Sequence, residues 1–463
     1  MVLRLGLRLS LPASHATEIF CQFRIQCVPV AFFSSGFVGD KPLLVRDFIR
    51  AALYDTKNGY FSKPSGPVGV LEKSIRFSQI QGREAYLQYL DTIYKQHDVA
   101  WFTPVELFKP WYAHAIAEAI LRTANLSVPL KIYEIGGGSG TCAKCILDYM
   151  LLNAPERVYN NLDYISVEIS PSLAKRQLET VGEVSSHLYR YRVEIRDALD
   201  RSGWQADPNP CWVIMLEVLD NLPHDLAYSP DQVSPWMETW IEKESDSLKV
   251  SEIYKPLQDT LIAQCIKIIG LDKDGSTQPT RFLSATRKIW SKAFPKPRKA
   301  WLPTGCLQLL QVLHWALPKM SLVSSDFSYL PDVRIMGDRA PLVSTKKDGI
   351  TVDHISYLDA KGDSDIFFPT DFFLLERIDH HSSGFTSEPS NSGSSKPIKL
   401  RRSIIRLLSL NLNFFGSFKL DTAAFIEQFG LPSKTRTKDG YNPLLDDFKN
   451  TKFYLSVPTH NVI

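Results

Sequence analysis

A glycine-rich loop between an apolar strand-like segment and a helical pattern constrains this chain more than any other feature. The loop is Gly136-Gly137-Gly138-Ser139-Gly140; the apolar segment is 131–135 and the helical pattern runs over 141–152. Such loops bind nucleotide-type ligands, because glycines let the ligand approach the backbone closely. A dinucleotide site would need a glycine where Thr141 stands, which disfavours a nicotinamide dehydrogenase, and no G-K-[ST] follows to make a phosphate-binding P-loop.

The segments around the loop alternate between strand-like and helix-like patterns. Strand-like runs lie at 131–135, 164–169, 191–195 and 211–216, and helical patterns lie at 141–152 and 171–180. Strands that alternate with helices are typical of a mostly parallel sheet with both faces covered. The sequence therefore predicts an α/β fold.

Two acids accompany the glycine loop. Glu134 lies two residues before the loop, and Glu168 ends the second strand-like run. A carboxylate at the carboxyl edge of such a sheet can accept hydrogen bonds from both ribose hydroxyls. The alternative is that the glycine-rich turn only joins a strand to a helix.

The pattern E-x-G-x-G-x-G followed by a second acid resembles the class I S-adenosylmethionine-dependent methyltransferases. The resemblance implies a Rossmann-like sheet, with helical additions forming a second, smaller substrate-side region, and S-adenosyl-L-methionine as the cofactor. It also places Asp197 near the adenine amino group. The cofactor-binding residues expected on this basis are Glu134, Gly136, Gly138, Gly140, Glu168 and Asp197.

A second pair of acids, Glu217 and Asp220, follows the apolar run 211–216. We expect the methyl acceptor there, because α/β sheets bind ligands at this edge. Two carboxylates at this edge can hold and orient a cationic acceptor. We therefore expect Glu217 and Asp220 to be catalytic. The alternative is that Asp220 only caps a turn before Pro223; His224 is expected to be a solvated turn residue.

The order of several motifs narrows the resemblance to the MidA-like (DUF185) methyltransferases, whose mitochondrial members methylate a protein arginine during assembly of respiratory complex I. These motifs are Gly59-Tyr60-Phe61, Thr103-Pro104-Val105-Glu106, 134–140, Val167-Glu168-Ile169-Ser170, 217–223 and Ser325-Asp326-Phe327. The resemblance implies a protein-arginine N-methyltransferase that forms symmetric dimethylarginine on a complex I subunit.

The chain departs from this family on the acceptor side. A longer insert precedes Phe102, no Ser separates Thr103 from Pro104, and Leu216 stands where many members carry Asn. These departures concern the substrate more than the cofactor. They leave open an alternative, a non-catalytic assembly factor that retains the methyltransferase fold.

The first 39 residues resemble a mitochondrial transit peptide. They hold Arg4, Arg8 and Arg24 but only one acid, Glu18, and such peptides are rich in arginine and poor in acids. We therefore expect the mature protein in the mitochondrial matrix. The alternative is a tail in which three arginines occur by chance.

Composition excludes several other classes. The 463 residues include 53 Lys+Arg and 50 Asp+Glu, for a net charge of +3, so no nucleic-acid partner is expected. No apolar run approaches the ~18–20 residues that a membrane span needs. Seven scattered cysteines indicate a reducing compartment. Cys142 and Cys145 have no second Cys or His pair near them, so no metal is expected.

These patterns divide the chain into seven parts. They are a transit peptide (1–39), an N-terminal helical lead-in (40–130), the cofactor-binding half of the core (131–225), a helical or loop insertion (226–300) ending in a basic cluster at 287–299, the second half of the core (301–379), a flexible Ser-rich loop (380–397) and a C-terminal segment packing on the core (398–463).

Overall fold

The computed structural model describes residues 38–39, 41–62, 68–97, 99–231, 233–243, 250–271, 296–329, 341–347, 350–384, 401–402 and 420–458. Almost all of the expected transit peptide, most of the basic cluster and most of the Ser-rich loop therefore lie outside the described residues. Within the described ranges, no helix is long and apolar enough to cross a membrane.

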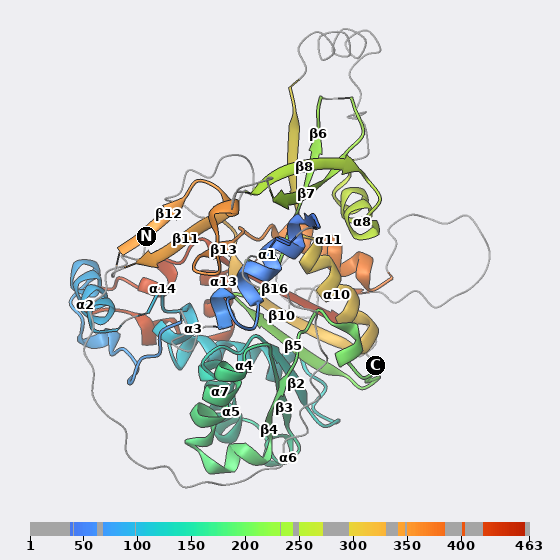
Figure 1. Cartoon of the computed structure of the whole chain (residues 1–463). Coiled ribbons are helices and arrows are strands. Elements are labelled where there is room, and N and C mark those ends of the chain that lie inside the picture. Colours follow the sequence, from blue (N-terminus) through green and yellow to red (C-terminus); the bar gives the residue numbers. More distant parts are fainter. Residues whose placement is uncertain are drawn as a thin grey trace, which may run out of the picture.

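The largest sheet is built on five parallel strands in the order β10-β5-β2-β3-β4 (Figure 1). Their bounds are β2 (Lys131–Ile135), β3 (Asp163–Glu168), β4 (Tyr191–Ile195), β5 (Cys211–Leu216) and β10 (Met320–Phe327). The four strands predicted around the glycine loop are confirmed to within one residue. β16 (Thr451–Pro458) pairs antiparallel with β10, and the short β14 (Arg401–Arg402) and β15 (Leu420–Asp421) pair with β16.

Helices cover both faces of this sheet, because each central strand is apolar on both sides. Ile132 and Ile214 share one core cluster with α4 (Trp111–Thr123), α5 (Thr141–Asn153) and α13 (Thr422–Phe429). Tyr133 and Val213 point to the other face and join α8 (Thr260–Ile269), α10 (Thr304–Ala316) and α11 (Phe372–Ser382). α7 (Pro171–Gly182) lies beside β4. The structure is therefore of the mixed α/β type.

Two further sheets lie beside the main one. The first joins β1 (Leu43–Leu44), β7 (Met237–Lys243), β6 (Asp225–Ser229) and β9 (Arg298–Leu302), with β8 (Val250–Pro256) paired to β7. The second joins β12 (Ile350–His354), β11 (Leu342–Lys347) and β13 (Asp365–Phe367).

The expectation that the additions are helical, and that 226–300 is a helical or loop insertion, is therefore wrong for β6 to β9, although α8 is a helix. Polar residues inside the strands hid the pattern. Glu238 and Thr239 of β7 are buried, and Glu238 accepts hydrogen bonds from Trp240 and from the backbone of Gln258 and Asp259.

The N-terminal region contributes α1 (Val45–Tyr54), η1 (Tyr60–Ser62), η2 (Phe77–Gln79), α2 (Arg83–Gln96) and α3 (Pro104–Leu107). The end of the expected helical lead-in holds two helices, α3 and α4, which are separate because Pro110 has no N–H to continue the first. The remaining short elements are α6 (Glu156–Asn160), η3 (Ser185–Tyr189), η4 (Arg201–Gly203), η5 (Tyr357–Asp359), η6 (Pro432–Thr435) and α14 (Pro443–Asp446).

Candidate active site

A cavity of about 600 Å³ opens at the carboxyl edge of the parallel sheet. It is lined by a residue at or just beyond the carboxyl end of each of four adjacent strands. These residues are Gly136 after β2, Glu168 at the end of β3, Asp197 after β4 and Glu217 after β5. Carboxyl ends of parallel strands meet at one edge, which brings these distant positions together. Residues of α1, α2 and α3 line the same cavity.

The glycine loop needs its glycines for two different reasons. Gly136, Gly138 and Gly140 have φ of +66°, +54° and +82°, values that residues with a side chain rarely adopt. A Cβ on Gly138 would meet no atom within 4 Å, whereas one on Gly140 would lie 2.8 Å from the Cα of Gln177. Gly138 therefore leaves room for a ligand, while Gly140, which does not line the cavity, lets α5 approach α7.

Glu134 and Glu168 are both buried and both line the cavity. Glu134 accepts a hydrogen bond from Tyr164 Oη at 2.9 Å, and Glu168 accepts one from the backbone N–H of Ser170 at 3.0 Å. Burial raises the pKa of each carboxyl to about 7, although these hydrogen bonds lower it. A cationic ligand would favour their charged forms.

Asp197 lines the cavity with both carboxylate oxygens engaged. Its Oδ1 accepts the backbone N–H of Leu199 at 2.8 Å, and its Oδ2 is paired with the guanidinium of Arg50. Arg50 comes from α1, and it also lines the cavity. This contact has no local signal in the sequence, because Arg50 lies 147 positions earlier in the chain.

Gln177 is a second residue that sequence reasoning missed. Its Nε2 donates to the carbonyl of Gly138 at 3.2 Å and to Glu168 Oε2 at 2.9 Å, and its Oε1 accepts from Ser166 Oγ at 2.6 Å. The side chain thus ties the glycine loop to the acid at the end of β3. A buried glutamine on a helix has no local sequence signature that would have revealed this role.

Glu217 and Asp220 lie together on the cavity wall. Glu217 has a φ of +52° and is the only non-glycine residue with positive φ among the described residues. Backbone strain of this kind costs roughly 1–2 kcal/mol and is found where the surrounding structure imposes it, often at functional sites. Asp220 Oδ1 is buried and has no hydrogen-bond partner among the described residues.

Asp326 of β10 binds the backbone of the loop that carries Glu217 and Asp220. Its Oδ2 accepts the backbone N–H groups of Leu219 and Asp220 at 2.9 and 3.1 Å. Burial, together with the charge of Glu217, raises the pKa of Asp326 to about 8. Burial also raises the pKa values of Glu217, with a contribution from Asp220, and of Asp220, with contributions from Asp326 and Asp365.

His224 differs from its expected place in a solvated turn. The ring is buried and stacks on Phe368 with 3.7 Å between ring centroids. Its Nδ1 lies 2.8 Å from the carbonyl of Leu222. The prediction of a solvated residue was wrong because the stacking partner, Phe368, comes from a distant part of the chain that the local turn pattern does not include.

The fold and the cavity define an α/β protein with a ligand site of nucleotide type at the edge of its sheet. Residues 113–390 match the family described as "Putative S-adenosyl-L-methionine-dependent methyltransferase", and the chain belongs to this family. Its cofactor is S-adenosyl-L-methionine. The resemblance to the MidA-like methyltransferases inferred from the motifs is thereby confirmed. The open space at Gly138 and the buried acids Glu134 and Glu168 fit a cationic cofactor with a ribose.

The chain is similar to several individual proteins. The chain is 23% identical over 366 residues to the Schizosaccharomyces pombe protein named "Protein arginine methyltransferase NDUFAF7 homolog, mitochondrial", covering 73% of this chain and 75% of that protein. It shares its fold with an uncharacterized Burkholderia thailandensis protein, at a TM-score of 0.52 and 14% identity over 90% of this chain and 87% of that one. Another structure from that organism, bound to S-adenosyl-homocysteine, has a TM-score of 0.48 and 16% identity over 74% and 72% of the two chains.

Proposed function

We propose that this chain is a protein-arginine N-methyltransferase of the mitochondrial matrix that modifies a subunit of respiratory complex I during assembly. The name of the S. pombe relative supports arginine as the acceptor and the mitochondrion as the location. The complex I substrate and symmetric dimethylation rest on the resemblance to the MidA-like family.

For the cofactor site, we propose that the main sheet is the Rossmann-like sheet of a class I methyltransferase. The parallel order β10-β5-β2-β3-β4 supports this. Gly136 and Gly138 give the cofactor access to the backbone, Glu134 faces its positive charge, Glu168 accepts bonds from the ribose hydroxyls and Asp197 lies near the adenine. Gly140 acts indirectly, by setting the position of the loop against α7. When bound, S-adenosyl-L-methionine supplies an electrophilic methyl group.

The acceptor half of the proposal rests on one observation, the buried Asp220 Oδ1, which has no hydrogen-bond partner among the residues that the structure describes. Asp220 lines the cavity together with Glu217, and its backbone N–H donates to Asp326. In the described part of the chain no lysine or arginine forms an ion pair with these three acids. Buried carboxylates that repel one another are costly unless a cation compensates them. A guanidinium, with its five donors and fixed charge, is suited to that place.

In this proposal Glu217 and Asp220 bind the guanidinium and orient one of its nitrogens. That nitrogen must lose a proton to complete the transfer. Burial raises the pKa of Glu217, so its carboxylate is a better proton acceptor than an ordinary one. Most of the rate enhancement would come from positioning and from electrostatic stabilisation in the cavity.

Complementation of a deletion strain tests the proposal. We expect wild-type protein to restore arginine methylation, measured by mass spectrometry of mitochondrial proteins, and assembly of complex I, measured on native gels. Glu217→Gln should restore neither, whereas Glu427→Gln, which removes an exposed acid of α13, should restore both. Assembly without methylation in Glu217→Gln would favour the non-catalytic assembly factor. Normal methylation by that variant would show that the acceptor residues are wrongly assigned.

A further inference from the structure

Helix α1 carries three polar side chains at intervals of four residues, Arg46, Arg50 and Tyr54. Such spacing places side chains on one face of a helix. The apolar residues of α1 form a core cluster with residues of β6, β7 and β13. The helix is therefore packed on the two smaller sheets, and Figure 1 shows it in blue between them and the strands of the main sheet.

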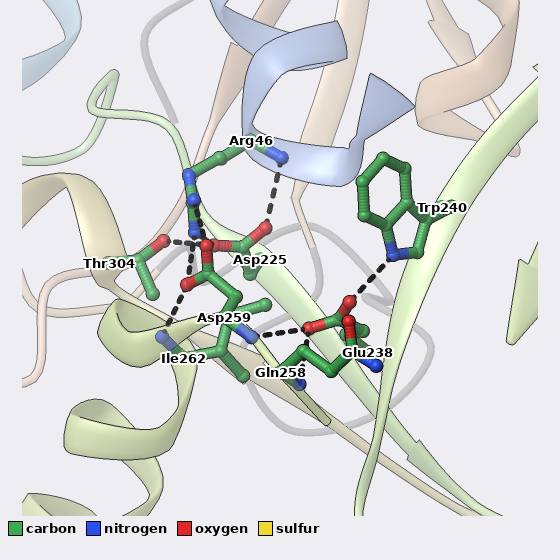
Figure 2. A network of polar contacts seen from close by, with 8 residues as sticks. All are labelled: Arg46, Asp225, Glu238, Trp240, Gln258, Asp259, Ile262 and Thr304. Atoms are coloured by element: carbon green, nitrogen blue, oxygen red, sulfur yellow. Dashed lines mark hydrogen bonds and ion pairs between the residues drawn. The ribbon is translucent and has the colours of Figure 1, made fainter. Parts of the chain in front are cut away.

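The first polar residue, Arg46, anchors the start of the helix outside the cavity. Its Nη1 donates to Asp225 Oδ2 at 2.7 Å and to Asp259 Oδ1 at 2.9 Å, and its Nη2 donates to Asp259 Oδ2 at 2.5 Å (Figure 2). The backbone N–H of Arg46 also donates to Asp225 Oδ1 at 3.3 Å. One guanidinium thus joins α1 to the first residue of β6 and to the residue that caps α8.

Both carboxylates of this anchor are held by further contacts (Figure 2). Thr304 Oγ1 donates to Asp225 Oδ2 at 2.7 Å. Asp259 Oδ1 accepts the N–H of Ile262 at 2.9 Å, and the N–H of Asp259 donates to Glu238 Oε2 at 2.9 Å. Because residues of β7, α8 and α10 hold the two carboxylates, their positions do not depend on Arg46 alone. None of these anchor residues lines the cavity.

The next two turns of α1 reach the cavity itself. Arg50 forms an ion pair with Asp197, which follows β4, and Tyr54 Oη donates to the carbonyl of Asn221 at 3.1 Å. All four of these residues line the cavity. One helix therefore contacts both the cofactor side and the acceptor side of the site.

We propose that α1 is a positioning element of the cofactor site, in which the Arg46 anchor fixes the helix so that Arg50 and Tyr54 are already in place when S-adenosyl-L-methionine binds. The inference rests on the proposed assignment of the cavity. A side chain that is held before binding loses less conformational freedom when the ligand arrives, which strengthens affinity without a new contact. Arg46 is then a positioning residue, and its replacement should weaken cofactor binding in a cavity that it does not line.

The test is the affinity of the full chain for S-adenosyl-homocysteine, measured by calorimetry. We expect Arg50→Gln to weaken binding on the order of 10-fold, as the loss of a charge-assisted contact would. Arg46→Gln should weaken it in the same direction, by roughly 3- to 10-fold. Amide hydrogen exchange over 45–54 should be faster in unliganded Arg46→Gln than in the unliganded wild type, and ligand binding should slow it more in the variant than in the wild type. Asp259→Asn serves if Arg46→Gln does not fold, because it leaves the bonds between Arg46 and Asp225 intact.

A second buried polar network supplies the matched control. Asp379 Oδ2 accepts hydrogen bonds from Tyr454 Oη and Ser456 Oγ at 2.8 and 2.9 Å, and none of the three residues lines the cavity. Asp379→Asn should lower thermal stability and leave the affinity unchanged. Wild-type affinity in a folded Arg46→Gln, or an equal loss of affinity in Asp379→Asn, would overturn the inference. Absence of binding by the wild type would instead overturn the assignment of the cavity.

Discussion

Thr141 Oγ1 donates a hydrogen bond of 2.6 Å to Oε2 of Glu106, a buried acid 35 positions earlier in the chain. Thr141 is the first residue of α5, directly after the glycine loop. The other oxygen of Glu106 accepts the backbone N–H of Leu71 at 2.6 Å and Lys109 Nζ at 2.5 Å. Glu106 therefore ties the end of the glycine loop to the N-terminal region, a role for the Thr103–Glu106 motif that its sequence did not indicate.

Glu106→Gln should destabilise the protein and weaken cofactor binding. Loss of the charge-assisted bonds should lower the free energy of unfolding by about 1.5–3 kcal/mol, measured by denaturant titration. Thr141→Val should cost about 1 kcal/mol. In the double variant the loss of unfolding free energy should be smaller than the sum of the two single losses, since both single variants remove the same hydrogen bond. Strict additivity would mean that this hydrogen bond contributes nothing.

Gly138→Val should fold and lose binding of S-adenosyl-homocysteine in calorimetry. A Cβ at this position meets no protein atom within 4 Å, so the side chain would occupy space that we assign to the cofactor. The control is Gly384→Val, because Gly384 also has positive φ and open surroundings but does not line the cavity. Both variants carry backbone strain, and only the first should lose affinity. Retained binding would remove residues 136–140 from the site.

Glu168→Ala should weaken binding of S-adenosyl-homocysteine 10-fold or more, because charge-assisted hydrogen bonds of about 1.5–3 kcal/mol each are lost. Asp163→Asn is the control, since Asp163 begins the strand that Glu168 ends. That variant should bind normally. An unchanged affinity in Glu168→Ala would leave Glu168 as a structural acid that fixes Gln177 and Ser170.

Affinity for the cationic cofactor should fall as the pH drops below about 7, because the pKa of Glu134 and that of Glu168 are both about 7. Protonation removes the negative charge that a sulfonium and an ammonium favour. Calorimetry with S-adenosyl-L-methionine between pH 5.5 and 8.5 checks this, and Glu134→Gln should flatten the profile. A pH-independent affinity would show that Glu134 and Glu168 do not interact with the positive charge of the cofactor.

Stability of the unliganded protein should show the opposite trend. The folded-state pKa values of Glu134 and Glu168 lie above the ordinary value of 4.5, so the folded protein binds more protons than the unfolded chain in this range. Their contribution to stability is present below pH 4.5 and is lost as the pH rises through about 7. Denaturant titrations of the wild type and of Glu134→Gln across this window measure the difference.

Asp220→Asn should stabilise the protein while it abolishes methyl transfer. Burial and the charges of Asp326 and Asp365 raise the pKa of Asp220, so its charged form is unfavourable in the folded state. The gain should be about 1 kcal/mol at pH 8 and should vanish in acid, where the carboxyl is already neutral. Unfolding measured at both pH values, with transfer assayed on the same protein, decides this. A loss of stability at pH 8 would mean that Asp220 has a compensating partner.

The sequence by itself determined the elements that depend on neighbouring residues. The strands at 131–135 and 211–216 and the loop that joins the first of them to a helix were predicted correctly, because apolar runs and glycines are local features. Parallel strands bring their carboxyl ends to one edge, so Glu168 and Glu217 could be placed in one cavity from the order of the elements alone.

Only the tertiary structure decided which side chains complete that cavity. The contacts of Arg50 with Asp197, of Tyr54 with Asn221 and of Asp326 with Leu219 join residues 147, 167 and 107 positions apart. The sheet β1-β7-β6-β9 also stayed hidden, since its strand β7 carries the buried polar residues Glu238 and Thr239, and the strand pattern does not show the partners of Glu238. Long-range packing sets these contacts, and a polar residue reveals its buried place only when its distant partner is known.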